Sequence, residues 1–180
     1  KEDLQAFGRF KPNGTDGIMP PLGRVSLFVD LLTSMVCSAR LARWDVGEQT
    51  LAQEQLPEVV EKMRALKQEQ LLFIYDRGYP SLTFIQQHKV LGVDFIFRLQ
   101  KGAYKTLWKR VERGETDFVD ELSTKDGAEY VRVVAIKLRT GKVEILITSL
   151  FCQTLFSWQD LCSIYTLRWH MEECYKRLKI

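Results

Sequence analysis

The chain has 180 residues, of which 46% are hydrophobic and 27% charged, and its formal net charge is +3. This composition is typical of a globular domain and excludes a disordered or fibrous chain, while the small net charge indicates no particular class of partner. No apolar stretch approaches the roughly 20 residues that a membrane-spanning helix requires. The four cysteines form no C-x-x-C pair, which favours reduced thiols in a cytosolic protein over a disulfide scaffold.

The N-terminal part, after a loop-like segment of some twenty residues, is expected to form two strands and a helix. The strands are predicted over 24–32 and 35–44, and because both of their faces are apolar, helices should cover both. A capping-box pattern begins at Asp45, so a helix should run from there to about residue 67, bent or split in two by Pro57. Its core-facing residues should be Val59, Val60, Met63 and Leu66.

The next segment has the pattern of a strand–helix–strand crossover. A short apolar run over 71–75 predicts a buried parallel strand, Ser81 can cap a helix over 82–90, and 93–98 predicts a second strand. Such a unit joins parallel strands and indicates α/β architecture.

The remaining chain, from residue 99 on, has a different pattern of predicted elements and charge. A basic helix is expected over 104–111, a β-hairpin over 130–138 and 143–150, and one long helix from Ser157 to Ile180. Residues 98–113 contain six basic side chains and one acidic one, a local charge of +5, whereas residues 115–129 contain one basic and six acidic ones, a local charge of −5. The small net charge therefore hides a basic block that could face a polyanion.

Two carboxylates are candidates for chemistry. Asp76 follows a buried strand at the end where α/β folds collect ligands, although Asp-x-Gly is also ordinary turn chemistry. Glu172 shares one ridge of the long helix with Tyr165, Arg168 and Lys179 at about 100° per residue. A solvated helix with an i, i+4 ion pair would also place Arg168 beside Glu172. A carboxylate that holds a divalent metal among cationic donors, however, suits phosphodiester chemistry.

These residues carry a family resemblance. The pattern Tyr165-x2-Arg168-x3-Glu172-x6-Lys179 resembles, gap for gap, the signature of DDE transposases of the bacterial insertion-sequence-four family. The segment Asp76-Arg-Gly-Tyr-Pro-Ser81 resembles that family's second-aspartate motif, and 93–99 the strand that follows it. The resemblance extends from about residue 22 to the end of the chain.

The resemblance implies a ribonuclease H-like α/β fold, a mixed sheet with flanking helices and a β-rich insertion. Asp76 and Glu172 would be catalytic and would bind two Mg²⁺ or Mn²⁺ ions in the complete enzyme, while Tyr165, Arg168 and Lys179 would bind phosphates of the DNA. A tryptophan of the chain, Trp108 or Trp158, could stack on a flipped base, although a tryptophan in the hydrophobic core is the commoner case.

The same resemblance divides the chain into an N-terminal part of the core (1–98), the β-rich insertion (99–150) and a C-terminal catalytic helix region (151–180). The family's first aspartate cannot be assigned to this sequence, so we expect that the chain starts after the first catalytic strand and is inactive alone. Measurable Mg²⁺-dependent strand transfer by the 180-residue chain would contradict this expectation.

The function expected from the sequence is that of a transposase catalytic core, which cuts and joins double-stranded DNA at insertion-sequence ends and at the target. It should act as a homodimer on DNA in the bacterial cytoplasm, associated with the nucleoid, without a membrane or a nucleotide cofactor. The alternatives are a catalytically dead, DNA-binding or regulatory remnant of such a transposase, and a ribonuclease H-like nuclease unrelated to transposition.

Overall fold

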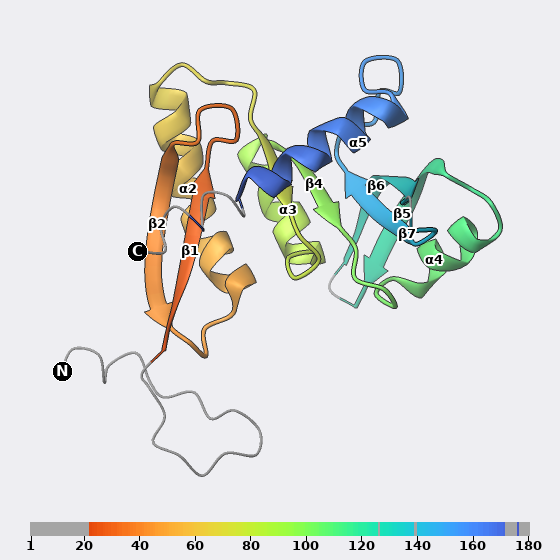
Figure 1. The fold of residues 1–180 in the computed structure, drawn as a ribbon, viewed down its shortest axis with the longest axis horizontal. Coiled ribbons are helices and arrows are strands. Elements are labelled where there is room, and N and C mark those ends of the chain that lie inside the picture. The colour runs from red at the N-terminus through yellow and green to blue at the C-terminus, as the bar shows by residue number, and fades with distance from the viewer. Residues whose placement is uncertain (1–21, 126, 139, 172–175, 177–180) are drawn as a thin grey trace, which may run out of the picture. The chain divides into compact units, whose positions relative to one another are not determined.

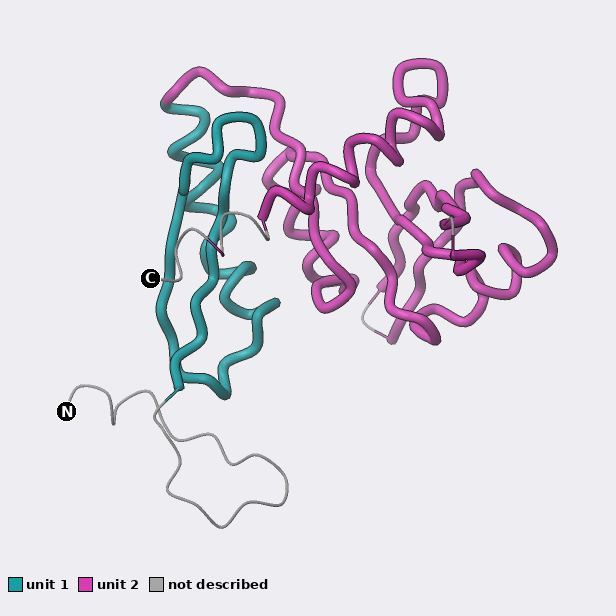
Figure 2. Tube along the Cα trace, viewed as in Figure 1, with its two compact units in different colours: residues 1–65 teal, residues 66–180 magenta. Residues whose placement is uncertain are grey.

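The computed structural model describes residues 22–125, 127–138, 140–171 and 176. The chain divides into two compact units, residues 1–65 and 66–180 (Figures 1 and 2), and each is considered by itself. Among the helices in the described ranges, none is long and apolar enough to cross a membrane.

The first unit contains an antiparallel hairpin of β1 (Gly23–Val29) and β2 (Val36–Arg43). The turn between them depends on Asp30, whose carboxylate accepts hydrogen bonds from the Leu32 backbone N–H at 2.9 Å and the Thr33 hydroxyl at 2.7 Å. The two strands predicted over 24–32 and 35–44 are therefore joined by a turn that Asp30 stabilises.

Helix α2 (Glu48–Ala65) packs against one face of this hairpin through a partly polar contact. Gln55 is completely buried, and its amide donates to the Ser38 hydroxyl at 3.0 Å. Val25 and its cross-strand partner Leu41 lie on the opposite face and are 50% and 58% exposed. The prediction that both faces of these strands are covered is therefore wrong for these positions, because apolar strand residues are also common on open faces.

Helix α2 is a single helix of 18 residues, so the expected split at Pro57 does not occur. Pro57 lies on the exposed side of the helix, where the carbonyl that loses its N–H partner can turn to water. Val59 and Val60 are buried as predicted, but Leu66 follows the end of the helix and is 62% exposed.

The second unit contains a five-stranded mixed sheet with the strand order β3-β4-β7-β6-β5. Its strands are β3 (Leu72–Tyr75), β4 (Asp94–Arg98), β5 (Asp117–Thr124), β6 (Gly127–Lys137) and β7 (Val143–Thr148). The pair β3–β4 is parallel and the other pairs are antiparallel, which confirms the predicted crossover and hairpin. Strands from before and after residue 98 belong to this one sheet. The domain boundaries expected at residues 98 and 150 stay a prediction.

Helices cover both faces of this sheet. Helix α3 (Leu82–Leu91), which Ser81 caps as expected, packs Phe84 against Phe97 of β4. Helix α5 (Trp158–Thr166) packs Leu161 on the other face, in a cluster with Ile96 of the same strand. Because side chains alternate along a strand, β4 contributes to both layers of the core.

The core beneath α3 is aromatic and contains one histidine. His88 is completely buried among Phe84, Phe95, Phe97 and Tyr75, and its Nε2 lies 3.0 Å from the Tyr75 hydroxyl. Burial lowers the pKa of His88 to about 4, so this side chain is neutral at physiological pH.

The C-terminal helix begins as predicted and is interrupted by a 3₁₀ turn, after which the described residues His170, Met171 and Lys176 are again α-helical. Ser157 forms a capping box with Asp160 and starts α5, which ends at Thr166 and passes into a 3₁₀ turn at Leu167–Trp169. A 3₁₀ turn advances about 120° per residue, so the ridge expected from uniform 100° steps is rotated after Thr166. Residues 172–175 and 177–180 lie outside the described residues.

Candidate active site

Asp76 follows directly on β3 and begins a turn in which its backbone carbonyl accepts the N–H of Tyr79 at 3.2 Å. Its local conformation is therefore that of an ordinary turn, as one interpretation of the sequence proposed. Its carboxylate, however, is only 35% exposed and lies against two arginines from distant parts of the chain.

The first of these arginines is Arg98, the last residue of β4. Because β3 and β4 are parallel, their carboxyl ends meet at one edge of the sheet and bring Arg98 to Asp76. Oδ1 of Asp76 lies 2.7 Å from Nε and 2.6 Å from Nη2 of Arg98, a two-pronged contact. Nη1 of Arg98 forms a further ion pair with Glu144 of β7.

The second arginine is Arg168, in the 3₁₀ turn that follows α5. Its Nη1 lies 3.5 Å from Oδ2 of Asp76, and its side chain is 14% exposed. The Nε of Arg168 and the hydroxyl of Tyr165 are both buried without a hydrogen-bond partner in the described part of the chain. Tyr165 itself is 5% exposed and belongs to the core cluster beneath α5.

The protonation of this cluster follows from its charges. Burial acts to raise the pKa of Asp76, but the backbone N–H of Arg77 and the positive charges of Arg168 and Arg98 outweigh it, so this pKa is lowered. Burial raises the pKa of Tyr165 to about 12 despite the two neighbouring arginines. Asp76 is therefore a carboxylate, and Tyr165 a neutral phenol, at physiological pH.

The structure brings together part of the site predicted from the sequence. Asp76 contacts Arg168, and Tyr165 lies below Arg168 with its ring centroid 5.6 Å from the guanidinium carbon. Glu172 and Lys179 lie outside the described residues. Sequence reasoning missed Arg98 and Glu144. The position of Arg98 at the end of a strand parallel to β3 was a usable signal, whereas the contact of Glu144 depends on the pairing of β7 with β4.

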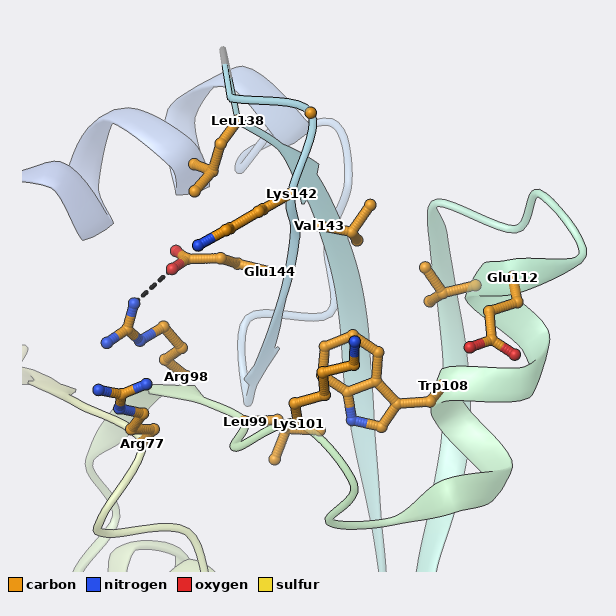
Figure 3. A pocket seen from close by; sticks show the side chains of 12 residues that line it. Arg77, Arg98, Leu99, Lys101, Trp108, Glu112, Leu138, Lys142, Val143 and Glu144 are labelled. Carbon is orange, nitrogen blue, oxygen red and sulfur yellow. Dashed lines mark hydrogen bonds and ion pairs between the residues drawn. The ribbon is translucent and has the colours of Figure 1, made fainter.

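A cavity of about 620 Å³ adjoins this cluster (Figure 3). Four basic residues, Arg77, Arg98, Lys101 and Lys142, line it together with Trp108 and Glu144. Nε1 of Trp108 is buried and has no partner in the described part of the chain. The basic block expected from the sequence thus contributes Arg98 and Lys101 to this cavity, whereas Arg110 from the same block is paired with Glu115 and Asp120.

The two candidate tryptophans differ in their surroundings. Nε1 of Trp158 donates to the carbonyl of Ala135 at 2.9 Å, and its ring packs against the core cluster beneath α5. Trp108 instead lines the basic cavity, and its N–H has no partner among the described residues. Trp158 is thus engaged in the fold, and Trp108 is the one placed where a ligand could reach it.

A divalent metal is the cofactor that this region could hold. Within the described ranges, no group of three or more His, Cys, Asp or Glu side chains is arranged to bind a metal ion. Asp76 does provide the hard carboxylate oxygen that Mg²⁺ and Mn²⁺ prefer, and one of its two oxygens has only a distant ionic contact. The residues described therefore fit one ligand of such a site.

Comparison with known proteins decides the family. A family model for the transposase DDE domain matches residues 22–180. The chain belongs to the transposase DDE domain family. A search of curated proteins finds no match. Membership places this transposase domain in an enzyme family that acts on DNA in transposition-related cleavage, and it fits the mixed α/β architecture of the second unit.

Proposed function

We propose that this transposase domain is a ribonuclease H-like catalytic core of the insertion-sequence-four family, which carries out metal-dependent cleavage and strand transfer at insertion-sequence ends. The observation that carries the proposal is the ion pair between Asp76 and Arg168. These residues are 92 positions apart, and each belongs to a different motif of the resemblance. Their meeting at the carboxyl edge of β3 and β4 supports one common site.

In this proposal Asp76 and Glu172 bind the metal ions. Bound Mg²⁺ or Mn²⁺ would activate a water or a 3′-hydroxyl group and stabilise the leaving oxygen. Arg168, Lys179 and Tyr165 bind phosphates of the transposon end, and the phenol ring of Tyr165 lies beside the guanidinium of Arg168. Arg168 suits this task, because a guanidinium can form two parallel hydrogen bonds with a phosphate.

The cavity supplies a second contact region for DNA. Lys101, Lys142 and Arg77 give it a positive charge that a phosphate backbone would neutralise. Trp108 is the better of the two tryptophan candidates for stacking on a base, because it lines this cavity, whereas Trp158 packs against the core. We further propose that the residues over 99–150 serve as the insertion that holds the DNA end, and that two copies act at paired ends.

The proposal is tested with Asp76→Asn in whichever polypeptide shows Mg²⁺-dependent cleavage, the 180-residue chain or a longer protein that contains it. Removing a metal carboxylate should lower the cleavage rate at least about 10³-fold, a loss similar in size to that of a major electrostatic group in other enzymes, while DNA binding persists. Asp94→Asn is the matched control, because Asp94 accepts a hydrogen bond from Ser149 and has no contact with the arginines. Equal activities of the two variants would refute the assignment of Asp76.

A second candidate function is that of a DNA-binding remnant without catalysis. It is favoured by the lining of the cavity, because Arg77, Lys101 and Lys142 can bind DNA phosphates without a metal ion. The 180-residue chain should then bind duplex DNA but show no cleavage with Mg²⁺ or Mn²⁺. Glu172→Gln separates the two functions, since it should abolish cleavage in an active protein and leave DNA binding unchanged in either case.

A further inference from the structure

We infer that Glu144 is a positioning residue, which holds Asp76 through Arg98 so that Oδ2 is the carboxylate oxygen left for a divalent cation. This inference rests on the proposed function, because it assigns Asp76 to a metal. Glu144 lies outside the motifs that carried the family resemblance, and Arg98 lies in the strand over 93–99, for which the resemblance implies no site residue. Arg98 lies on β4, which pairs with β3, and Glu144 lies on β7, the next strand in the sheet.

The two oxygens of Asp76 have different surroundings. Oδ1 accepts the backbone N–H of Arg77 at 2.7 Å and meets Nε and Nη2 of Arg98 at 2.7 and 2.6 Å. Three donors therefore converge on an oxygen that has two lone pairs. Oδ2 has one ionic contact in the described chain, with Arg168 at 3.5 Å, so it keeps lone-pair capacity for another ligand.

Arg98 can orient Asp76 only if its own guanidinium is fixed. Its side chain is 16% exposed, and the prong that does not contact Asp76 is paired with Glu144. Arg98 of β4 lies opposite Leu146 of β7. Glu144 is two residues before Leu146, so it lies on the same face of the sheet and is the diagonal neighbour of Arg98. The sheet register thus holds Glu144 against Arg98, and Figure 3 shows the two side chains directed toward each other.

Charge supports the same role. Asp76 alone faces two arginines, an arrangement with an excess positive charge that would repel a divalent cation. Glu144 adds a second carboxylate, so that Arg98 and Arg168 are balanced by two negative charges. Glu144 therefore contributes through both geometry and charge, and it acts on Asp76 through Arg98.

Mn²⁺ binding to the folded 180-residue chain, followed by electron paramagnetic resonance, tests the inference. Glu144→Gln keeps the shape but not the charge and should weaken Mn²⁺ binding by about 3- to 10-fold, at or below the lower end of effects seen for partners of metal ligands. Glu144→Asp keeps the charge and should recover part of this loss. The matched control is Glu129→Gln, since Glu129 also pairs with one cation and is 21% exposed, against 23% for Glu144.

A second measurement does not depend on metal. The Nε–H of Arg98 is sheltered by its contact with Asp76, so its exchange with water, measured by nitrogen-15 NMR, should be slow in the wild type. It should accelerate in Glu144→Gln and not in Glu129→Gln. Unchanged Mn²⁺ affinity together with unchanged exchange in Glu144→Gln would overturn the inference. If Asp76→Asn leaves Mn²⁺ binding intact, the metal assignment of the proposed function fails, whereas the exchange rate still decides whether Glu144 fixes Arg98.

Discussion

Arg132 and Arg98 lie in one sheet, and their contacts show two uses of a buried arginine. Arg132 of β6 is completely buried, grips both oxygens of Asp117 at 2.8 and 2.7 Å, and donates to the carbonyls of Leu150 and Phe156. Arg98 also binds carboxylates, but it is itself 16% exposed and lines a cavity, and one oxygen of its partner Asp76 has only a 3.5 Å contact. A fully satisfied network fixes the fold, whereas a carboxylate with an unfilled oxygen remains available for chemistry.

The largest effect on stability should come from Arg132→Met. It leaves two backbone carbonyls and Asp117, whose side chain is 21% exposed, without their donor, and breaking a largely buried pair in this way costs about 3 kcal/mol. Urea unfolding followed by circular dichroism measures the loss. The control is Arg110→Met, which removes an ion-paired arginine that is 31% exposed from the same unit and should cost less. Equal losses would mean that Arg132 is no more structural than a surface residue.

His88 should make stability depend on pH. Its pKa is lowered from 6.5 to about 4 in the folded state, so between these values the unfolded chain binds a proton that the folded chain does not. Stability is therefore complete above pH 6.5 and falls by about 3 kcal/mol as the pH decreases to 4. Unfolding free energies measured between pH 4 and 7 check this, and His88→Phe should flatten the profile. A steep profile that persists in the variant would assign the dependence to another group.

Arg98→Met should separate stability from activity. Asp76 keeps the N–H of Arg77 and the charge of Arg168, so the variant should lose only about 1.5–3 kcal/mol of stability, the usual contribution of hydrogen bonds to charged groups. Metal-dependent cleavage should fall far more than this stability loss explains. The comparison with Arg132 fails if Arg98→Met unfolds as readily as Arg132→Met or retains full cleavage activity in the folded state.

The smallest effect on stability should come from the cavity lysines. Lys101→Ala and Lys142→Ala change exposed residues, so the free energy of unfolding should stay within about 0.5 kcal/mol. Each should reduce the slope of log K against log salt for duplex DNA binding by about one unit. Lys125→Ala removes the same charge from outside the cavity and should leave the slope unchanged. A slope that falls equally in all three variants would remove the cavity from the DNA contact surface.

Much of the local structure could be predicted from the sequence, since it depends on contacts between near neighbours. The helix caps at Ser81 and Ser157 and the hairpin of β6 and β7 follow from side-chain chemistry and alternation over a few residues. Where a local rule met a solvent-facing position, it failed. Pro57 does not split α2, on whose exposed side it lies, and Leu66 is exposed because the helix has already ended.

The sequence by itself determined the candidates Asp76 and Arg168 and the crossover that sets Asp76 at the end of a parallel strand. Only the tertiary structure decided what surrounds Asp76. The pairing of β7 with β4 brings Glu144 to Arg98 across 46 residues, and the 3₁₀ turn after α5 brings Arg168 to the same carboxylate. Such contacts depend on sheet register and helix ends, which many distant residues set together, and no spacing within a single segment encodes them.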